Sequence, residues 1–244
     1  MTTDVRLDRV AETNEALARS MVYRLLSQAF AYPTPVGVER LLHEDLPLAE
    51  AVSASLPAGV RGAFDRVVEA LTAATVQALE TAYRAVFSHV HSADCPMYET
   101  DYTVRDVWKQ TRELADLGGF YRAFGLEEQG ERQDNVCVEL EFLHVLAYKQ
   151  AWAMAQGKRR HEETCRITQE TFLRDHVLRW VPDFVRRVEA LAGSGPYAAV
   201  AALASAFLME EAARFGLERV SSTVPGRLPD EEAAEEIGLC EGAP

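Results

Sequence analysis

Apolar residues recur at helical spacing along almost the whole chain, and no stretch alternates for long enough to predict a strand. The first predicted helix spans about Asp8 to Ala31, and it ends at Tyr32-Pro33 because a residue before proline is pushed out of the α region. Its apolar stripe comprises Val10, Leu17, Met21, Leu25 and Phe30. The pattern therefore predicts a long amphipathic helix at the start of the chain.

Prolines and caps divide the next part of the chain into shorter helices. Thr34 followed by Pro35 is typical of an N-cap and a first helical position, and it predicts a helix through Leu42. Pro47 and Pro57 are each expected to open another helix. Two further apolar stripes follow, Val60, Phe64, Val67 and Leu71, and then Val76, Leu79, Tyr83, Val86 and Phe87.

An irregular loop over Ser88–Asp101 interrupts this pattern, and helix resumes near Thr103. One side of that helix is predicted to carry Val104, Val107, Trp108, Leu114, Leu117 and Tyr121, and Gly125 is its left-handed C-cap. Asp134 is the predicted N-cap of the most apolar helix, which runs to about Gln156 with Val136, Leu140, Leu143, Ala147 and Trp152 inward.

The last predicted helices have Ile167, Phe172, Leu173, Val177, Leu178 and Trp180 on one face, with a kink or restart at Pro182. Pro196 opens the final helix, which ends near Gly216. The fold class is therefore all-α, a compact bundle of about ten helices, either undivided or in two lobes separated at the Ser88–Asp101 loop. Residues 1–219 form the folded domain. Residues 220–244, rich in acids and prolines, are predicted to be a disordered acidic tail.

Composition excludes several classes of function. The 244 residues include 38 acidic and 25 basic ones, so the formal charge is −13. A nucleic-acid-binding protein needs the opposite balance, and anionic membranes would repel this chain. Mean hydropathy is −0.14, no window is apolar enough to span a bilayer, and Met1–Val10 lacks a secretory signal. Four scattered cysteines without a CxxC suit a reducing compartment. We expect a cytoplasmic protein without stable membrane insertion.

Two clusters are candidates for metal chemistry. Glu141 and His144 are three residues apart on one helix face, the spacing that di-iron bundles use, but no other histidine in the chain has Glu at i−3. The alternative interpretation is that both border the core. His89, His91, Asp94 and Cys95 crowd one loop without the paired ligands that structural zinc needs. Cys137 lies near a predicted helix start. Its thiol either has a lowered pKa or, in the interpretation that we prefer, is buried and structural.

Aromatic and acidic residues are unusually dense in three segments. These segments are 95–102, 133–142 and 172–180. Acids in loops are usually solvated, acids near a helix start offset its dipole, and a tryptophan at helical spacing is usually core. Each explanation suffices for one segment, but all three together invite a shared explanation.

Taken in order, five elements resemble the TorD/DmsD/NarJ family of redox-enzyme maturation chaperones. The resemblance covers roughly Leu79 to Phe184. The elements are Leu79-Glu80 with Tyr83 and Phe87; Pro-Met-Tyr-Glu-Thr-Asp-Tyr at 96–102; Phe120-Tyr121 through Phe124-Gly125-Leu126; Asp134-Asn135-Val136 with Glu139-Leu-Glu-Phe-Leu143; and Phe172-Leu173 with His176, Trp180 and Phe184. Two departures stand out. Asn135 replaces the family's usual histidine, and Ser88–Cys95 replaces a Gly/Pro-rich stretch. The second variant resembles the branch that accompanies periplasmic molybdenum dehydrogenases and reductases for hydrocarbons, sulfides or oxyanions.

The resemblance implies a chaperone, not an enzyme, with no cofactor of its own. It would bind the leader or N-terminal region of a molybdopterin enzyme's catalytic subunit during cofactor insertion and delay twin-arginine export. Carboxylates suit the leader's arginines, and an aromatic groove suits its apolar stretch. The expected peptide-binding residues are Tyr98, Glu99, Asp101, Tyr102, Asp134, Asn135, Glu139, Glu141, Phe142, His176 and Trp180. Asp134 and Glu99 are expected to face solvent and contribute most of the polar contact.

Three questions stay open at this level. The rival functions are an all-α, di-iron-like enzyme using Glu141 and His144, and an interaction module that never meets a redox enzyme. The chaperone could be a monomer or a dimer. Direct binding of guanine nucleotide or molybdopterin, attributed to the family, has no phosphate-binding motif behind it in this chain.

Overall fold

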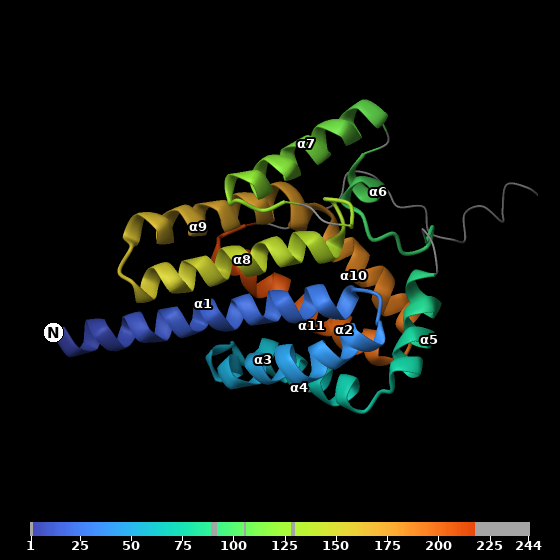
Figure 1. Cartoon of the computed structure of the whole chain (residues 1–244), viewed down its shortest axis with the longest axis horizontal. Coiled ribbons are helices and arrows are strands. Elements are labelled where there is room, and N and C mark those ends of the chain that lie inside the picture. Colours follow the sequence, from blue (N-terminus) through green and yellow to red (C-terminus); the bar gives the residue numbers. More distant parts are fainter. Residues whose placement is uncertain (1, 89–91, 105, 128–129, 218–244) are drawn as a thin grey trace, which may run out of the picture.

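The computed structural model describes residues 2–88, 92–104, 106–127 and 130–217, and their regular elements are all helical (Figure 1). A single isolated bridge between Tyr98 and Asn135 is the only β-pairing within these ranges. The all-α prediction is confirmed. The elements are α1 (Thr2–Phe30), α2 (Pro35–Arg40), η1 (Leu41–Asp45), α3 (Leu46–Val52), η2 (Ser53–Ser55), α4 (Ala58–Thr72), α5 (Val76–Phe87), α6 (Glu99–Thr103), α7 (Val107–Ala123), α8 (Val136–Ala155), α9 (Arg159–Phe172), η3 (Leu173–Val177), α10 (Leu178–Ala192) and α11 (Pro196–Arg214).

The long helix α1 is the centre of the packing. It lies along α8 and also packs on α3 and α11, while α9 covers the other side of α8 (Figure 1). Helix α11 packs against α4 and α10. Because α8 lies between α1 and α9, most of its surface is covered, which explains its nearly continuous apolar sequence. A strip that includes Glu141, Tyr148 and Trp152 stays exposed.

One continuous hydrophobic cluster fills the interior. Every long helix contributes residues to it, although the outer turns of α9 do not. Its members come from both sides of the Ser88–Asp101 loop, so that loop does not divide the core into two lobes. The largest fully buried side chains include Tyr23, Phe30, Phe64, Phe142, Phe172, Trp180, Phe184 and Phe207. Several of these rings meet edge to face, as Phe142 and Phe172 do with centroids 4.8 Å apart.

Local signals for helix ends were reliable. The Thr34 hydroxyl accepts a hydrogen bond from Gly37 N–H, as an N-cap does, and Pro35 occupies the first turn of α2. At the end of α7, Gly125 has a φ of +73°. Leu126 N–H donates to Tyr121 C=O and Gly125 N–H to Arg122 C=O, which completes the predicted C-cap. Pro196 begins α11 as expected.

Trp152, which was predicted to face inward, is 47% exposed, and Trp108 (85%) and Ile167 (48%), which belong to predicted apolar stripes, are exposed as well. Trp108 lies in the first turn of α7, which projects beyond the body of the bundle (Figure 1), so no helix covers it there. Trp152 and Ile167 lie on outer faces of α8 and α9. The inward prediction for Trp152 was wrong because helical spacing identifies a stripe but not whether a neighbouring element covers it.

The helix does not restart at Pro182, since Pro182 lies inside α10. The irregularity comes earlier, where the π-helical turn η3 joins α9 to α10 without a break. A π turn inserts one extra residue and rotates the side chains that follow. It leaves His176, Val177 and Trp180 all buried.

Helix ends and tails complete the comparison with the prediction. Helix α1 starts at Thr2, earlier than expected, and a short helix, α6, lies within the part predicted to be irregular or just resuming helix. None of the described helices combines the length and hydrophobicity that a membrane span needs. The predicted acidic tail at 220–244 and His89 and His91 lie outside the described residues.

Candidate functional site

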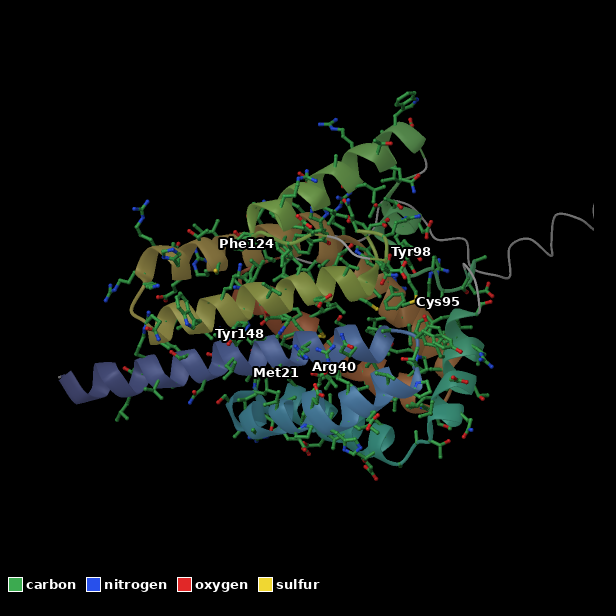
Figure 2. The ribbon with its side chains drawn as sticks, viewed as in Figure 1. Met21, Arg40, Cys95, Tyr98, Phe124 and Tyr148 are labelled. Carbon is green, nitrogen blue, oxygen red and sulfur yellow. The ribbon has the colours of Figure 1, made fainter. Side chains whose placement is uncertain are left out.

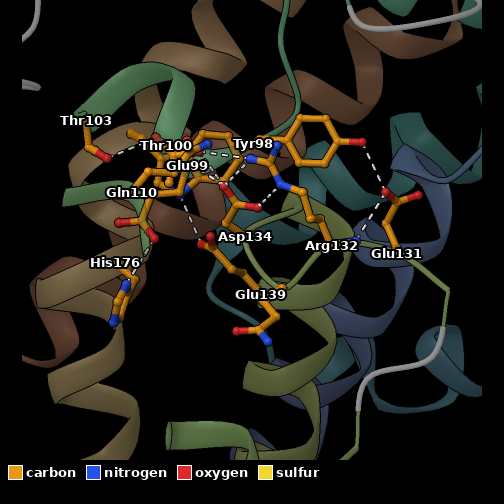
Figure 3. Close-up of polar contacts among 12 residues, drawn as sticks. Tyr98, Glu99, Thr100, Thr103, Gln110, Glu131, Arg132, Asp134, Glu139 and His176 are labelled. Carbon is orange, nitrogen blue, oxygen red and sulfur yellow. Dashed lines mark hydrogen bonds and ion pairs between the residues drawn. The ribbon is translucent and has the colours of Figure 1, made fainter. Parts of the chain in front are cut away.

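A short backbone pairing brings the aromatic and acidic segments of the sequence together. Glu99 N–H donates to Asp134 C=O over 2.8 Å, and Val136 N–H donates to Met97 C=O over 2.9 Å. These bonds hold α6 against the start of α8. The turn η3 completes the cluster by supplying His176 (Figure 3). The start of α10 adds Arg179 and Trp180.

Asp134 is the polar centre of this cluster, but it does not cap α8. Its fully buried carboxylate accepts hydrogen bonds from Thr100 Oγ1 (2.7 Å) and from Arg132 Nε and Nη2 (2.8 and 2.7 Å). Burial by itself raises the pKa of Asp134, but the bonds from Arg132 and Thr100 outweigh it and hold the pKa below its usual value. The N-cap is Asn135, whose side chain accepts from Cys137 N–H.

Glu99 and His176 form a second buried pair. His176 Nδ1 lies 3.0 Å from Glu99 Oε2, and His176 Nε2 lies 3.3 Å from Asp116 Oδ2. Burial lowers the pKa of His176, but the carboxylates of Glu99 and Asp116 raise it more, so the net direction is upward. The imidazole therefore favours its charged form more than a free histidine does.

Glu139 lies deeper and is bound by an aromatic donor. Trp180 Nε1 donates to Glu139 Oε2 over 3.0 Å, and neither residue is exposed. Burial raises the pKa of Glu139 well above its usual value, and the nearby charge of Glu99 adds to the shift. Glu139 thus favours its neutral form, in which it can sit beside Glu99 without charge repulsion.

The burial of these groups corrects one expectation. Glu99 and Asp134 do not face solvent, since both are fully buried and each is held by a cation or imidazole of the same chain. Of the eleven expected site residues, only Asp101 and Glu141 are exposed, while Tyr98 is half-buried. The buried ones are Glu99, Tyr102, Asp134, Asn135, Glu139, Phe142, His176 and Trp180.

The accessible surface beside this cluster is a ring-lined cavity of about 610 Å³. Tyr32, Tyr83 and Phe87 pack together along one wall, with centroids 5.2 Å and 4.8 Å apart in successive pairs. Its other lining residues include Phe30, Cys95, Met97, Tyr98, Glu131, Asn135 and Cys137. The cavity therefore joins the end of α1, α5, the loop before α6 and the start of α8.

A smaller depression of about 180 Å³ continues from this cavity. Glu131 lines both depressions. The smaller one is also lined by Glu127 and Glu141 and by the apolar or aromatic side chains of Tyr121, Leu126, Val138 and Phe142. We call the two depressions together the Glu131 groove. Glu131 accepts a hydrogen bond from Tyr98 Oη over 3.0 Å, and the Arg132 guanidinium lies 4.3 Å from the Tyr98 ring centroid (Figure 3).

Sequence reasoning missed four groove residues as site residues: Tyr32, Tyr83, Glu127 and Glu131. Tyr83 appeared only in an apolar stripe and in the family resemblance, and residues 127–132 carried no predicted site. The available signal for Glu127 and Glu131 was that they lie just before the aromatic and acidic segment that begins at Gln133. Only the pairing of residues 97–99 with 134–136 places Glu131 against Tyr98.

The proposed metal pair Glu141 and His144 does not form a site. Glu141 is exposed, whereas His144 Nδ1 lies 2.8 Å from Ser20 Oγ and 3.0 Å from Ser20 O on α1. The di-iron-like alternative is therefore not supported. Among the described residues, a metal-sized arrangement of ligand atoms occurs at Glu99, Glu113 and His176. Arg179 Nη1 already lies 3.3 Å from Glu113 and 3.6 Å from Glu99, so a cation of the chain faces these carboxylates.

The cysteines fit a structural role. Burial raises the pKa of Cys95 to about 12, and it also raises the pKa of Cys137. A lowered pKa at Cys137 is not supported, and its side chain is half-buried at the wall of the cavity rather than fully buried.

Comparison of the sequence with known proteins identifies a matching family and related proteins. A family model described as the nitrate reductase delta subunit matches residues 53–186, which include every segment of the buried cluster. The chain is 28% identical over 210 residues to the perchlorate reductase assembly chaperone protein of Dechloromonas aromatica (strain RCB), covering 82% of this chain and 90% of the relative. It is 29% identical over 188 residues to the selenate reductase assembly chaperone protein of Thauera selenatis, covering 75% and 82%.

Proposed function

Because the chain belongs to the nitrate reductase delta subunit family, we propose that it is a dedicated cytoplasmic assembly chaperone for the catalytic subunit of a molybdopterin oxidoreductase. Both relatives are named as assembly chaperones and not as enzymes. Both names specify a reductase of an oxyanion, which supports a client of that class. The proposal assigns the chain no reaction of its own.

The observation that carries the proposed mode of action is the Glu131 groove. It offers exposed carboxylates at Glu127, Glu131 and Glu141 beside an apolar, ring-lined cavity. A twin-arginine leader has the complementary order, two guanidinium groups followed by an apolar stretch. Arginine binds carboxylates with strong, charge-assisted hydrogen bonds, and an apolar segment binds by burying its side chains in a groove.

The buried residues have a supporting role in this proposal. Glu99, Asp134, Glu139, His176 and Trp180 hold α6 against α8, and so they position Tyr98, Asn135 and the groove wall. Tyr98, Asn135, Glu141 and Phe142 line the groove directly. Binding the leader there would keep it from the export machinery while the client receives its cofactor.

The groove is tested by calorimetry with the client's leader peptide and the full chain. We expect Glu131→Gln to weaken binding about 3- to 5-fold, since an exposed ion pair contributes up to about 1 kcal/mol. Glu69→Gln, at an exposed position on α4, is the matched control and should leave affinity unchanged. Equal affinities for the wild type and for Glu131→Gln, Glu127→Gln and Glu141→Gln would remove the groove from the proposal.

The chaperone function itself has a separate test. Deleting the chain from its host should leave the client reductase present but lacking molybdopterin, and restoring the chain should restore loading. A client that matures fully without the chain contradicts the proposal, whatever the groove variants show.

A further inference from the structure

A second cavity, of about 860 Å³, lies at the opposite end of α8 from the Glu131 groove. We call it the Trp152 pocket, lined mainly by Phe124, Tyr148, Lys149, Trp152, Arg160 and His161. Figure 2 shows Phe124 and Tyr148 well separated from Tyr98 and Cys95. The pocket is therefore distinct from the proposed leader site.

The pocket combines exposed rings with cations. Tyr148 is 52% exposed and Trp152 is 47% exposed. The Lys149 ammonium lies 5.4 Å from the Phe124 ring centroid, and the Lys158 ammonium lies 4.2 Å from that of Trp152. The sequence has only three lysines, and two of them, Lys149 and Lys158, lie at this pocket although the net charge of the chain is −13.

These cations are not neutralised by their neighbours. Glu162 pairs with Arg9 on α1, and Glu163 pairs with Arg166, so both nearby acids of α9 are directed elsewhere. Within the described part of the chain, Lys149, Lys158 and Arg160 form no ion pair with a carboxylate. An occupant of this pocket should therefore carry several carboxylates together with apolar side chains.

A segment with this chemistry occurs in the same chain. Residues 230–241 read Asp-Glu-Glu-Ala-Ala-Glu-Glu-Ile-Gly-Leu-Cys-Glu, with six acids, no basic residue and an apolar Ile-Gly-Leu-Cys run. Charge and hydrophobicity both complement the Trp152 pocket, whereas the acidic Glu131 groove would repel this segment.

The segment is also within reach. Helix α11 ends against α1, where Arg214 pairs with Glu15 and Arg19 lies over Phe215. Arg9 of α1, about 15 Å further along the helix at 1.5 Å per residue, pairs with Glu162, next to His161 of the pocket. Twelve residues lie between Leu217 and Asp230, and this stretch can span about 40 Å when extended.

We propose that residues 230–241 dock into the Trp152 pocket of their own chain. Glutamates of the segment pair with Lys149, Lys158 and Arg160, and Ile237 and Leu239 cover the Tyr148 and Trp152 rings. The tail then shields the exposed Tyr148 and Trp152 rings from unselective contacts.

Zero-length carbodiimide coupling of the full chain at low concentration tests the contact. We expect links within one chain from Lys149 or Lys158 to Glu231–Glu236, at least fivefold more frequent than links to Lys109. Lys109 is the third lysine, exposed on α7, and is the internal control. Links no more frequent at the pocket than at Lys109 overturn the proposal. Links found only between two chains overturn it as well, in favour of a pocket that binds a second copy.

Hydrogen exchange of the full chain provides a second readout. Replacing Glu231, Glu232, Glu235 and Glu236 by Gln should raise the exchange rates around the α8–α9 turn, residues 156–161, at least threefold. Exchange at α4 should stay unchanged and serves as the control for global stability. Unchanged exchange at 156–161 contradicts docking, because removing the charges should release the segment.

Discussion

Asp134 joins three segments of the site through one carboxylate. It binds the α6 backbone and hydroxyl of Thr100 and the guanidinium of Arg132. Asp134→Asn keeps the shape of the side chain but removes its charge. We expect the free energy of unfolding to fall by about 2 kcal/mol, since hydrogen bonds to charged groups contribute roughly 1.5–3 kcal/mol. Urea denaturation measures this loss.

The control for Asp134 is Asp65→Asn, at an exposed position of α4, which should change stability by less than about 0.5 kcal/mol. Because the folded pKa of Asp134 is lowered, its contribution is present above the unfolded pKa and is lost as pH falls through the folded pKa. Equal losses for the two variants would show that Asp134 does not hold the site together.

His176 predicts the opposite dependence on pH. Its folded pKa is raised, so the stability it contributes is fully present below the unfolded pKa and is lost as pH rises through the folded value. The groups that face it are Glu99, Asp116, Glu113, Asp175 and Arg179. His176→Gln should therefore cost more stability at pH 6 than at pH 9. Urea unfolding at both values checks this, and a pH-independent difference would contradict a charged His176.

At the level of single elements, α7 and the turn that ends it provide a matched pair of glycines, Gly119 and Gly125. Gly119 lies in the exposed helix with nothing within 4 Å of an added Cβ, and Gly125 has equal space but a φ of +73°. Gly119→Ala should raise the free energy of unfolding by about 0.5–1 kcal/mol. Gly125→Ala should lower it by about 1–2 kcal/mol, because an L-residue is strained in the left-handed region. Thermal or urea unfolding of both variants separates the effect of backbone conformation from that of side-chain packing. A change in the free energy of unfolding with the same sign in both variants would contradict this account of the C-cap.

The element that periodicity could not predict is α6. Five residues are too few to show an apolar stripe. The helix is held by pairing with residues 134–136 and by the burial of Glu99, Thr100 and Tyr102 rather than by its own propensity. The turn η3 was missed for a similar reason, because a π turn depends on what the following helix packs against.

At the scale of the whole molecule, the charge of −13 has a kinetic consequence. A cationic leader is attracted over a range set by the Debye length, which shrinks as salt is added. The association rate with the leader peptide should fall roughly tenfold between about 0.05 M and about 0.3 M salt, with a smaller change in the dissociation rate. Stopped-flow mixing measures both, and an association rate independent of salt would leave only the apolar part of the groove.

A buried polar network also acts at this scale. Arg19 on α1 binds Glu211 on α11 and Gln169 on α9, and Tyr23 donates to the same Glu211. These contacts join residues that are 150 or more positions apart in the chain. Sequence reasoning proposed none of them, because a buried arginine and an exposed one look alike until the partner helix is placed.

The sequence by itself determined the helical class, most helix boundaries, the caps at Thr34 and Gly125, and a family resemblance confirmed by the match over residues 53–186. These follow from interactions between residues a few positions apart. Only the tertiary structure decided that Glu99 and Asp134 are buried supports while Glu131 is accessible, and that Trp152 is exposed. Carboxylates of identical chemistry differ in burial through the packing of distant helices, and no local pattern records that packing.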